Sequence, residues 1–567
     1  MVAGARSFTL DDTFLEPAVL DPPPTRHALF ILLIALAAVL HLATAGWGDL
    51  YDGADGQFAG GAREMLATQQ WLEPTNNGVP HLHPPPLVYW LIILSYKIFG
   101  VSAMAARLPI ATATIASIAL TFLIGERLAG YWRGFAAGLI HLCFAGTFLL
   151  SRAVTAEPVF SAFLAGAIFC AIAGYQRQRF RRAWFAGFWF CASLACLSKG
   201  LASLLYLAAV CLLLGVFFRQ ARLRFRSLLH WSYLLFFLAI VAPWFVWAEI
   251  HFPGCFLRSF GSPNEPGLPR WQFLVLHFAW WFPASFLVLP GLLFAPRRIV
   301  RWHEIGFAEA LPLCWMAIGF APGLFVGHQS VYSSISTWSA FALWAALVWE
   351  RTPRRLQAGG LVSLAAAGIA LATVAGLAPG LLQSIAPPAI LPHWLALRRL
   401  LEIAGAALGF SGLVALYFAF RQRAEITLLM IMISMVPIGL CLAEGVSRLV
   451  SSFSLAGAAR FLNPRLGERG QVLYEGTPRN GSTLTFYLNR RFFFVNEKPD
   501  FHDQSDAARE KYLDENFVLE AWNRSDPIYL IIDEKRVVYW QKLVTDRVHI
   551  YHQVTTCGHY VVLSNQL

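Results

Sequence analysis

Residues Tyr51–Trp90 decide the fold, because an acidic turn, an amphipathic run and a proline-stiffened return lie here between two apolar stretches. The segment begins Tyr-Asp-Gly-Ala-Asp-Gly at 51–56 and closes His-Leu-His-Pro-Pro-Pro-Leu-Val-Tyr-Trp at 81–90. Long apolar stretches such as the two that flank the segment can enter a lipid bilayer. We therefore expect the segment to lie on one face of a membrane, with the surrounding spans as its scaffold.

The composition is that of an integral membrane protein. Of 567 residues, 57% are hydrophobic and 14% charged, and the mean hydropathy is +0.54. Apolar runs of about 18 or more residues recur, and each can cross a hydrocarbon core about 30 Å thick as a helix. The net charge of +11 does not indicate nucleic acid binding, since most basic residues lie in short turns between apolar runs. Basic residues in such turns set membrane orientation.

The apolar runs predict an all-α polytopic membrane protein of about thirteen spans. The predicted spans are residues 28–46, 105–125, 134–150, 157–174, 183–198, 200–218, 229–249, 272–295, 305–327, 331–349, 359–384, 399–420 and 425–446. The first is expected to be an uncleaved helix rather than a signal peptide, because its polar leader is long and acidic. Residues 86–99 are shorter and favour an interfacial helix.

The chain divides into three predicted parts. Residues 1–27 form a cytoplasmic N-terminal tail, and residues 28–446 form the transmembrane domain with a first outer loop at 47–104. Arginines concentrate in alternate turns, which the positive-inside rule assigns to the cytoplasm. An odd number of spans then places residues 447–567 outside, on the face of the acidic turn.

Residues 447–567 are expected to form a small extracytoplasmic α/β domain, acting as a lid or a structural cap. Short apolar runs are typical of strands, and helical patterning covers about 506–522. The apolar runs are residues 472–474, 484–488, 492–495, 529–532 and 560–563.

Two aspartates in the acidic turn are candidates for a general base. Asp52 and Asp55 are three residues apart, beside Gly53 and Gly56. Either could deprotonate an acceptor near the membrane surface, or both could be solvated charges that cap the following helix. That helix carries apolar residues at helical spacing from Phe58 onward, which suits a position in the membrane interface.

Two further charged residues stand at predicted span ends on the same face. Glu157 begins an apolar run with Pro158 in its first turn, where the helix dipole alone favours a carboxylate. Lys199 and Gly200 separate two apolar runs on the outer side, where a lysine does not serve the positive-inside bias. A phosphate partner would explain Lys199, and snorkelling to the surface is the alternative.

Several strings resemble the GT-C membrane glycosyltransferases, in particular the ArnT (aminoarabinose transferase) and protein O-mannosyltransferase group. The first-loop motif is the specific one, and the later strings are individually weak. The strings are Ala62–Leu66, Pro85–Trp90, Ser151–Pro158, Leu197–Gly200, Ala242–Trp244 and Val562–Asn565.

The resemblance implies an inner-membrane enzyme that transfers a hexose or pentose from a polyprenyl-phosphate donor to a lipid A, protein or glycan acceptor. It assigns the base to Asp55 or Asp52, with Asp55 in the second acidic position of the motif. The second-loop acid of the family falls on Glu157, and the Lys-Gly pair falls on Lys199. Arg270 is expected to serve a later outer loop.

Two departures from the family pattern concern phosphate binding. Pro84 occupies the position where relatives carry a lysine, and the adjacent His83 could partly replace that lysine as a donor. His328, four residues before Tyr332, stands where a lysine is common. Histidine carries less charge than lysine at neutral pH.

The expected reaction is a direct displacement at the anomeric carbon, with inversion. The leaving phosphate would be met by Lys199 together with His83, Arg152 or Arg270. A divalent cation bridging acid and phosphate is compatible with the sequence, but no strong ligand cluster requires one, so the metal is unknown. The alternative hypotheses are a lipid or solute transporter and a non-catalytic relative of the family.

Overall fold

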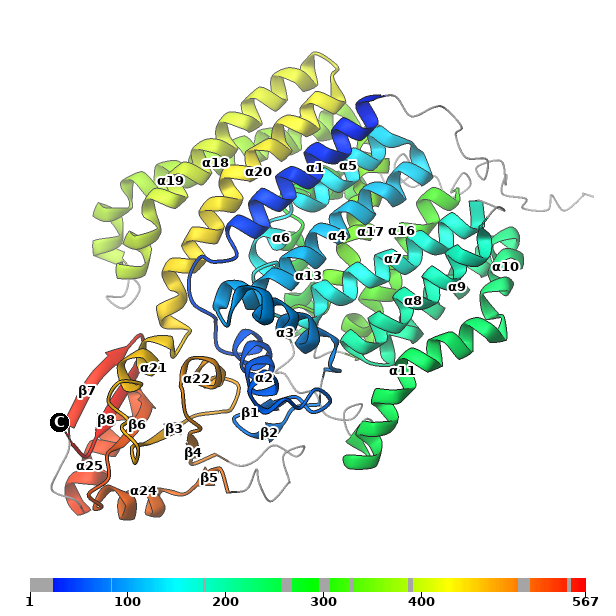
Figure 1. Ribbon diagram of the computed structural model, residues 1–567. Helices are drawn as coiled ribbons and strands as arrows, with labels where there is room; N and C mark the ends of the chain where they lie inside the picture. The colour runs from blue at the N-terminus through cyan, green and yellow to red at the C-terminus, as the bar shows by residue number, and fades with distance from the viewer. Residues whose placement is uncertain are drawn as a thin grey trace, which may run out of the picture.

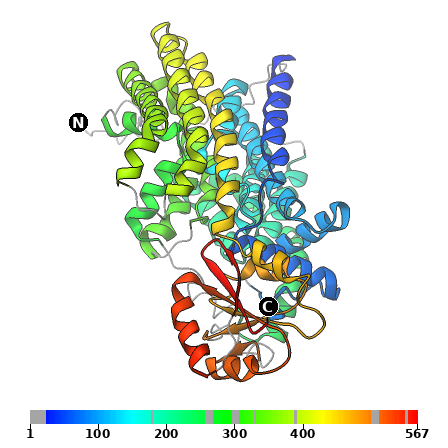
Figure 2. The same cartoon turned by 90° about the vertical axis from the view of Figure 1, so that its left-hand side faces the viewer.

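The computed structural model consists of a helical bundle and an α/β domain that lies beyond one end of it (Figures 1 and 2). The acidic turn and the helix after it lie where the two parts meet. The structure describes residues 24–82, 84–176, 180–255, 268–294, 306–326, 331–385, 391–497, 510–547 and 552–566.

Eight helices in the described ranges are long and apolar enough to cross a membrane. As helices they pair their backbone N–H and C=O groups within the segment, as a bilayer requires. These helices are α1 (Pro24–Ala43), α4 (Ala103–Ala129), α7 (Ala156–Gln176), α11 (Trp231–His251), α16 (Phe307–Ala321) with η3 (Pro322–Val326), α18 (Arg354–Ile385), α19 (Leu391–Phe420) and α20 (Ala424–Leu449).

Several predicted spans are shorter or divided, and the total of about thirteen stays a prediction. The run at 134–150 breaks near Cys143 into two helices, and the run at 272–295 breaks near Pro283. The shorter helices of the bundle are α5 (Tyr131–Leu142), α6 (Ala145–Leu150), α8 (Arg181–Lys199), α9 (Ala202–Phe217), α10 (Arg219–Phe225), η2 (Arg226–Leu229), α13 (Arg270–Trp280), α14 (Ala284–Phe294), η4 (Ile335–Thr337), α17 (Trp338–Val348) and η5 (Trp349–Arg351).

The segment between α1 and α4 forms a compact layer at one end of the bundle. It holds α2 (Ala54–Thr68), the two-stranded hairpin β1 (Thr75–Asn76) and β2 (Val79–Pro80), and α3 (Leu87–Phe99). Its buried apolar side chains share one core with the ends of α7, α8 and α11. This shared core fixes the layer against the bundle.

The α/β domain is built on one six-stranded sheet with the order β5-β4-β3-β6-β8-β7. The strands β5, β4, β3 and β6 are parallel, and β8 and β7 are antiparallel. The elements are η6 (Val450–Ser452), α21 (Ala456–Leu462), β3 (Gln471–Glu475), α22 (Ser482–Tyr487), β4 (Phe493–Val495), β5 (Tyr512–Leu513), α24 (Glu515–Trp522), β6 (Ile528–Asp533), η7 (Glu534–Arg536), α25 (Val537–Arg547), β7 (His552–Cys557) and β8 (Tyr560–Ser564).

Two sequence expectations for this domain were wrong in detail. The run at 484–488 belongs to helix α22 rather than to a strand, and α22 packs on α2. Within the described residues, the helix expected from about 506 begins at Glu515, because the side chain of Asp514 accepts a hydrogen bond from the backbone N–H of Phe517 (2.9 Å). A carboxylate in that position caps a helix start.

Helix α2 is largely buried, and its position in a membrane interface stays a prediction. Arg63 donates to the backbone carbonyl of Leu488 (3.1 Å), and Glu64 accepts from Thr75 (2.8 Å). The side of α2 that carries Arg63 and Glu64 is thus partly covered by the α/β domain and the hairpin.

Candidate active site at the loop end of the bundle

Asp55 lies in the first turn of α2 and is buried, with 3% of its surface exposed. One carboxylate oxygen accepts a hydrogen bond from the backbone N–H of Val154 (2.7 Å), and the other accepts from the N–H of Tyr51 (3.4 Å). The guanidinium of Arg107 lies 3.7 Å from that second oxygen. Burial raises the pKa of Asp55 above its usual value, while Arg107 acts in the opposite direction.

Asp52 faces the α/β domain instead. Its Oδ1 accepts from the backbone N–H of Thr483 (2.9 Å) and from the Thr483 hydroxyl (2.5 Å). Its Oδ2 is buried and has no hydrogen-bond partner among the described residues. Burial raises the pKa of Asp52 to about 7, partly offset by the bonds from Thr483. The two aspartates of the acidic turn therefore occupy different environments.

Glu157 and Lys199 form an ion pair at adjoining helix ends. Lys199 Nζ lies 2.5 Å from Glu157 Oε1 and 5.0 Å from the centre of the Phe160 ring. Glu157 stands in the first turn of α7 and Lys199 in the last turn of α8, where each charge also complements the helix dipole. Gly200 ends α8 with a φ of 95°, a conformation that favours glycine.

Arg152 belongs to the loop between α6 and α7, residues 151–155, which we call the second loop. Its side chain is buried and donates to the backbone carbonyl of Trp47. Within the described ranges, its Nε and Nη1 are buried without an acceptor, and so is the hydroxyl of Thr155. Burial first, and then Arg107, lowers the pKa of Arg152 to about 10. A buried guanidinium with open donors is suited to an anion.

The other predicted site residues are less closely gathered. Tyr332 lies in a turn, where its backbone carbonyl accepts a hydrogen bond from the N–H of Ile335 (3.1 Å). The carbonyl of Ile335 in turn accepts from Ser161, one turn beyond Glu157 on α7 (3.4 Å). Arg270 begins α13 with an exposed side chain that reaches the carbonyl of Phe325 (3.5 Å). Among the described residues, it contacts none of the groups above. His83 and His328 lie outside the described residues.

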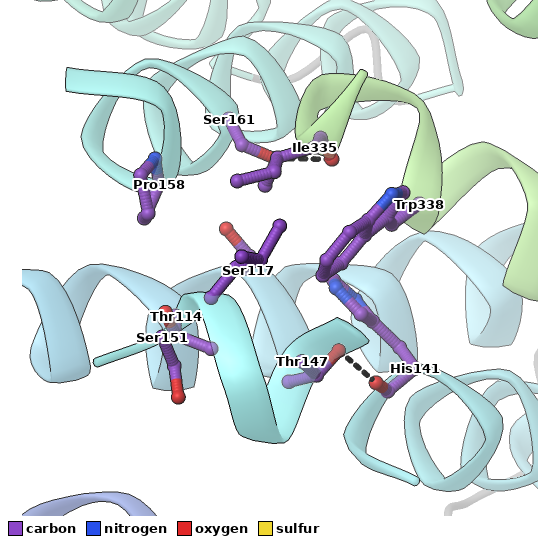
Figure 3. Close-up of a pocket in the computed structure, with 10 residues that line it drawn as sticks. Thr114, Ser117, His141, Thr147, Ser151, Pro158, Ser161, Ile335 and Trp338 are labelled. Carbon is purple, nitrogen blue, oxygen red and sulfur yellow. Dashed lines mark hydrogen bonds between the residues drawn. The ribbon is translucent and has the colours of Figure 1, made fainter. Parts of the chain in front are cut away.

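A small cavity lies beside the second loop, inside the bundle (Figure 3). It has room for roughly one water molecule. Ser151 and Pro158 line it on the loop side, and the hydroxyl of Ser117 is buried there with no partner in the described part of the chain. The remaining lining residues are Thr114, His141, Thr147, Leu150, Ser161, Ile335 and Trp338.

The sequence did not single out Arg107 or Thr483, although each contacts one of the candidate carboxylates. Arg107 had a signal, since it is a lone arginine inside an apolar span, and ionisable groups there mark functional sites. Thr483 had none, because its contact joins residues 431 positions apart. Three or more His, Cys, Asp or Glu side chains do not gather into a metal-binding group within the described ranges. The divalent cation stays a prediction.

The fold and the site define a polytopic helical membrane protein, with buried carboxylates and an ion pair at the end of the bundle that meets the α/β domain. The dolichyl-phosphate-mannose-protein mannosyltransferase family matches residues 83–247. An undecaprenyl phosphate-alpha-4-amino-4-deoxy-L-arabinose arabinosyl transferase of Pseudomonas fluorescens is 26% identical over 52% of this chain and 52% of its own length.

The fold matches two crystal structures of ArnT from Cupriavidus metallidurans at 17% identity. The apo structure gives a TM-score of 0.79 over 95% of this chain and 98% of ArnT. The structure bound to undecaprenyl phosphate gives 0.77 over 94% and 97%. The chain spans about half the length of the curated relatives that it matches in sequence. The protein thus has the ArnT-like GT-C fold, and its sequence is similar to the ArnT and protein mannosyltransferase group.

Proposed function

We propose that the protein is an inner-membrane glycosyltransferase that takes a sugar from a polyprenyl-phosphate donor and passes it to an acceptor on the outer face. In this proposal the N-terminus is cytoplasmic, residues 28–446 carry the catalytic domain, and residues 447–567 form the periplasmic or extracellular domain. The acceptor is lipid A, a protein or a glycan. Relatives named for undecaprenyl-phosphate arabinosyl transfer, together with the ArnT-like fold, support this class of donor.

One observation supports the proposal most directly: residues from three distant segments converge at the loop end. Asp55, at the start of α2, accepts a hydrogen bond from the backbone N–H of Val154 in the second loop. Glu157 follows three residues later and is paired with Lys199 at the end of α8. A buried carboxylate and a carboxylate–ammonium pair are thereby linked through residues 154–157, an arrangement suited to a base and a phosphate-binding cation.

Asp55 is the general base of the proposed reaction. It takes the proton from an acceptor hydroxyl or amine while that oxygen or nitrogen forms a bond to the anomeric carbon. The bond between the anomeric carbon and the phosphate oxygen breaks, and its electrons leave with the polyprenyl phosphate. One displacement at this carbon inverts its configuration.

The leaving phosphate is stabilised by cations near the second loop. Lys199 supplies a point charge, and Arg152 supplies two buried donor nitrogens that lack acceptors in the described structure. Tyr332 lies in a turn linked to α7, and in this scheme its hydroxyl donates a hydrogen bond to the phosphate. His83, Arg270 and His328 keep their predicted roles as further phosphate ligands. Asp52 is an interdomain anchor in this scheme, since Thr483 occupies one of its oxygens.

Transfer in liposomes tests the proposal. The purified protein is supplied with undecaprenyl-phosphate-linked 4-amino-4-deoxyarabinose and lipid A, and released undecaprenyl phosphate is measured. The expected result is transfer by the wild type and by Glu425→Gln, an exposed carboxylate at the start of α20, but not by Asp55→Asn. Transfer that persists in Asp55→Asn would exclude Asp55 as the base. No transfer with this donor or with hexose-bearing polyprenyl phosphates would overturn the proposed function.

A further inference from the structure

Arg107 is a buried arginine that the proposed reaction does not use directly. It lies in the second turn of α4, and 1% of its surface is exposed. A guanidinium is kept inside a protein only where its charge and its N–H groups are compensated. Its surroundings therefore show what it holds in place.

Its N–H groups point to backbone carbonyls from both loops of the candidate site. Nε donates to the carbonyl of Arg152 in the second loop (3.1 Å). Nη1 lies within hydrogen-bond distance of the carbonyls of Ala45 (3.2 Å), Trp47 (3.1 Å) and Gly48 (2.9 Å). Nη2 donates to the carbonyl of Asp49 (2.5 Å). Five carbonyls from two segments thus converge on one planar group.

The same guanidinium forms an ion pair with the candidate base. Nη2 lies 3.7 Å from Asp55 Oδ2, and both side chains are almost fully buried. Arg152, the other cation that acts on Asp55, contributes less. Its own backbone carbonyl is one of the five that Arg107 holds. Arg107 is thereby connected to the base and to the backbone of the residue proposed to meet the phosphate.

We propose that Arg107 is the positioning residue of the site. It fastens residues 45–49 to the second loop and compensates the charge of Asp55, so that the base and the phosphate-binding arginine keep a fixed separation. The inference rests on the proposed function for its catalytic meaning. Lysine cannot replace arginine in this role, since a single ammonium lacks the planar set of donors that spans both segments.

Hydrogen exchange on the full-length protein in detergent tests the fastening. Arg107→Lys is compared with Arg127→Lys, which alters the other end of the same helix, where Arg127 donates to Gln176 (3.3 Å). We expect about tenfold faster amide exchange at 45–55 and 151–155 in Arg107→Lys, and wild-type exchange there in Arg127→Lys. Unchanged exchange in Arg107→Lys would overturn the proposal.

A second measurement separates charge compensation from simple packing. Thermal unfolding is followed for Arg107→Gln, Asp55→Asn and the double variant. If Arg107 compensates Asp55, Arg107→Gln leaves an uncompensated buried carboxylate, and adding Asp55→Asn restores part of the lost stability. A double variant that folds where Arg107→Gln does not is the same result in its strongest form. Additive losses would overturn the charge-compensation part.

Neither measurement depends on transfer activity, so the two proposals can fail separately. If the wild type transfers sugar, Arg107→Gln should also move the acidic limb of the pH profile to higher pH, because a carboxylate that loses its cation binds its proton more tightly. If the wild type transfers nothing, the proposed function fails, while exchange and unfolding still decide the role of Arg107.

Discussion

Asp55 accepts a 2.7 Å hydrogen bond from the backbone N–H of Val154, a residue 99 positions further along the chain. This bond fixes the acidic turn to the second loop, whose next residues lead directly into α7. Because Glu157 begins that helix and pairs with Lys199, the position of the acidic turn is coupled to the ion pair.

The first prediction separates the two aspartates. Asp55→Asn should lower the transfer rate about 10²–10⁴-fold, the usual contribution of a general base, because an amide cannot accept the acceptor proton. Asp52→Asn should lower it less than about tenfold, since the amide oxygen can still accept both bonds from Thr483. Initial rates with one donor and one acceptor measure both effects. Equal losses in the two variants would contradict the assignment.

The second prediction concerns the ammonium of Lys199. Lys199→Gln should weaken binding of undecaprenyl phosphate about 10–100-fold, as expected for losing a hydrogen bond to a charged group. Glu157→Gln should not weaken this binding, because Glu157 competes with the phosphate for the same ammonium. Titration of the protein in nanodiscs with undecaprenyl phosphate measures both affinities. Weaker binding in Glu157→Gln, or unchanged binding in Lys199→Gln, would show that the pair is only structural.

Much of the architecture could be predicted because it follows from local patterns. Apolar runs placed α1, α4, α7 and α11 close to their observed bounds. The Pro158 and Gly200 signals correctly marked the start of α7 and the end of α8. Proline in a first turn and glycine after a last turn have such effects in any sequence.

What the sequence could not supply was the pairing of distant residues. Nothing local distinguishes Asp52 from Asp55, since the difference comes from Thr483 on one side and Val154 on the other. The run at 484–488 alternates like a strand, yet it belongs to a short helix with most of its residues buried. Short buried elements of either type carry similar apolar runs.

The third prediction follows from the raised pKa of Asp52. The pKa of Asp52 in the folded protein is about 7, against 3.8 for an unperturbed aspartate, so the folded state binds the proton more tightly than the unfolded chain does. Stability from this group is therefore fully present below about pH 4 and is lost as pH rises through about 7. The stability of wild type relative to Asp52→Asn should fall by about 2 kcal/mol between pH 5.5 and 8.5.

Thermal unfolding of both proteins across that pH interval checks the sign. The neighbouring titratable groups Asp55, Tyr474 and Tyr560 are common to both proteins, so their contributions largely cancel in the difference. A difference that stays constant with pH would mean that the Asp52 carboxylate is ionised throughout. That outcome would mean that the bonds from Thr483 outweigh burial.

The last prediction tests how closely the α/β domain must seat on the acidic turn. A Cβ at Gly56 would lie 2.4 Å from the Ser482 hydroxyl oxygen and 2.5 Å from the Thr483 backbone nitrogen. Real Cβ atoms do not approach other atoms so closely, so Gly56→Ala should push α22 away from α2 and cost about 1–3 kcal/mol of stability. Gly359→Ala, on the exposed side of α18 with nothing within 4 Å, is the matched control and should be neutral or stabilising.

If the turn needs the domain to hold Asp52, Gly56→Ala should also expose residues 51–56 to faster amide exchange while the exchange of α18 stays unchanged. Wild-type exchange at 51–56 would show that the turn keeps its conformation without the domain.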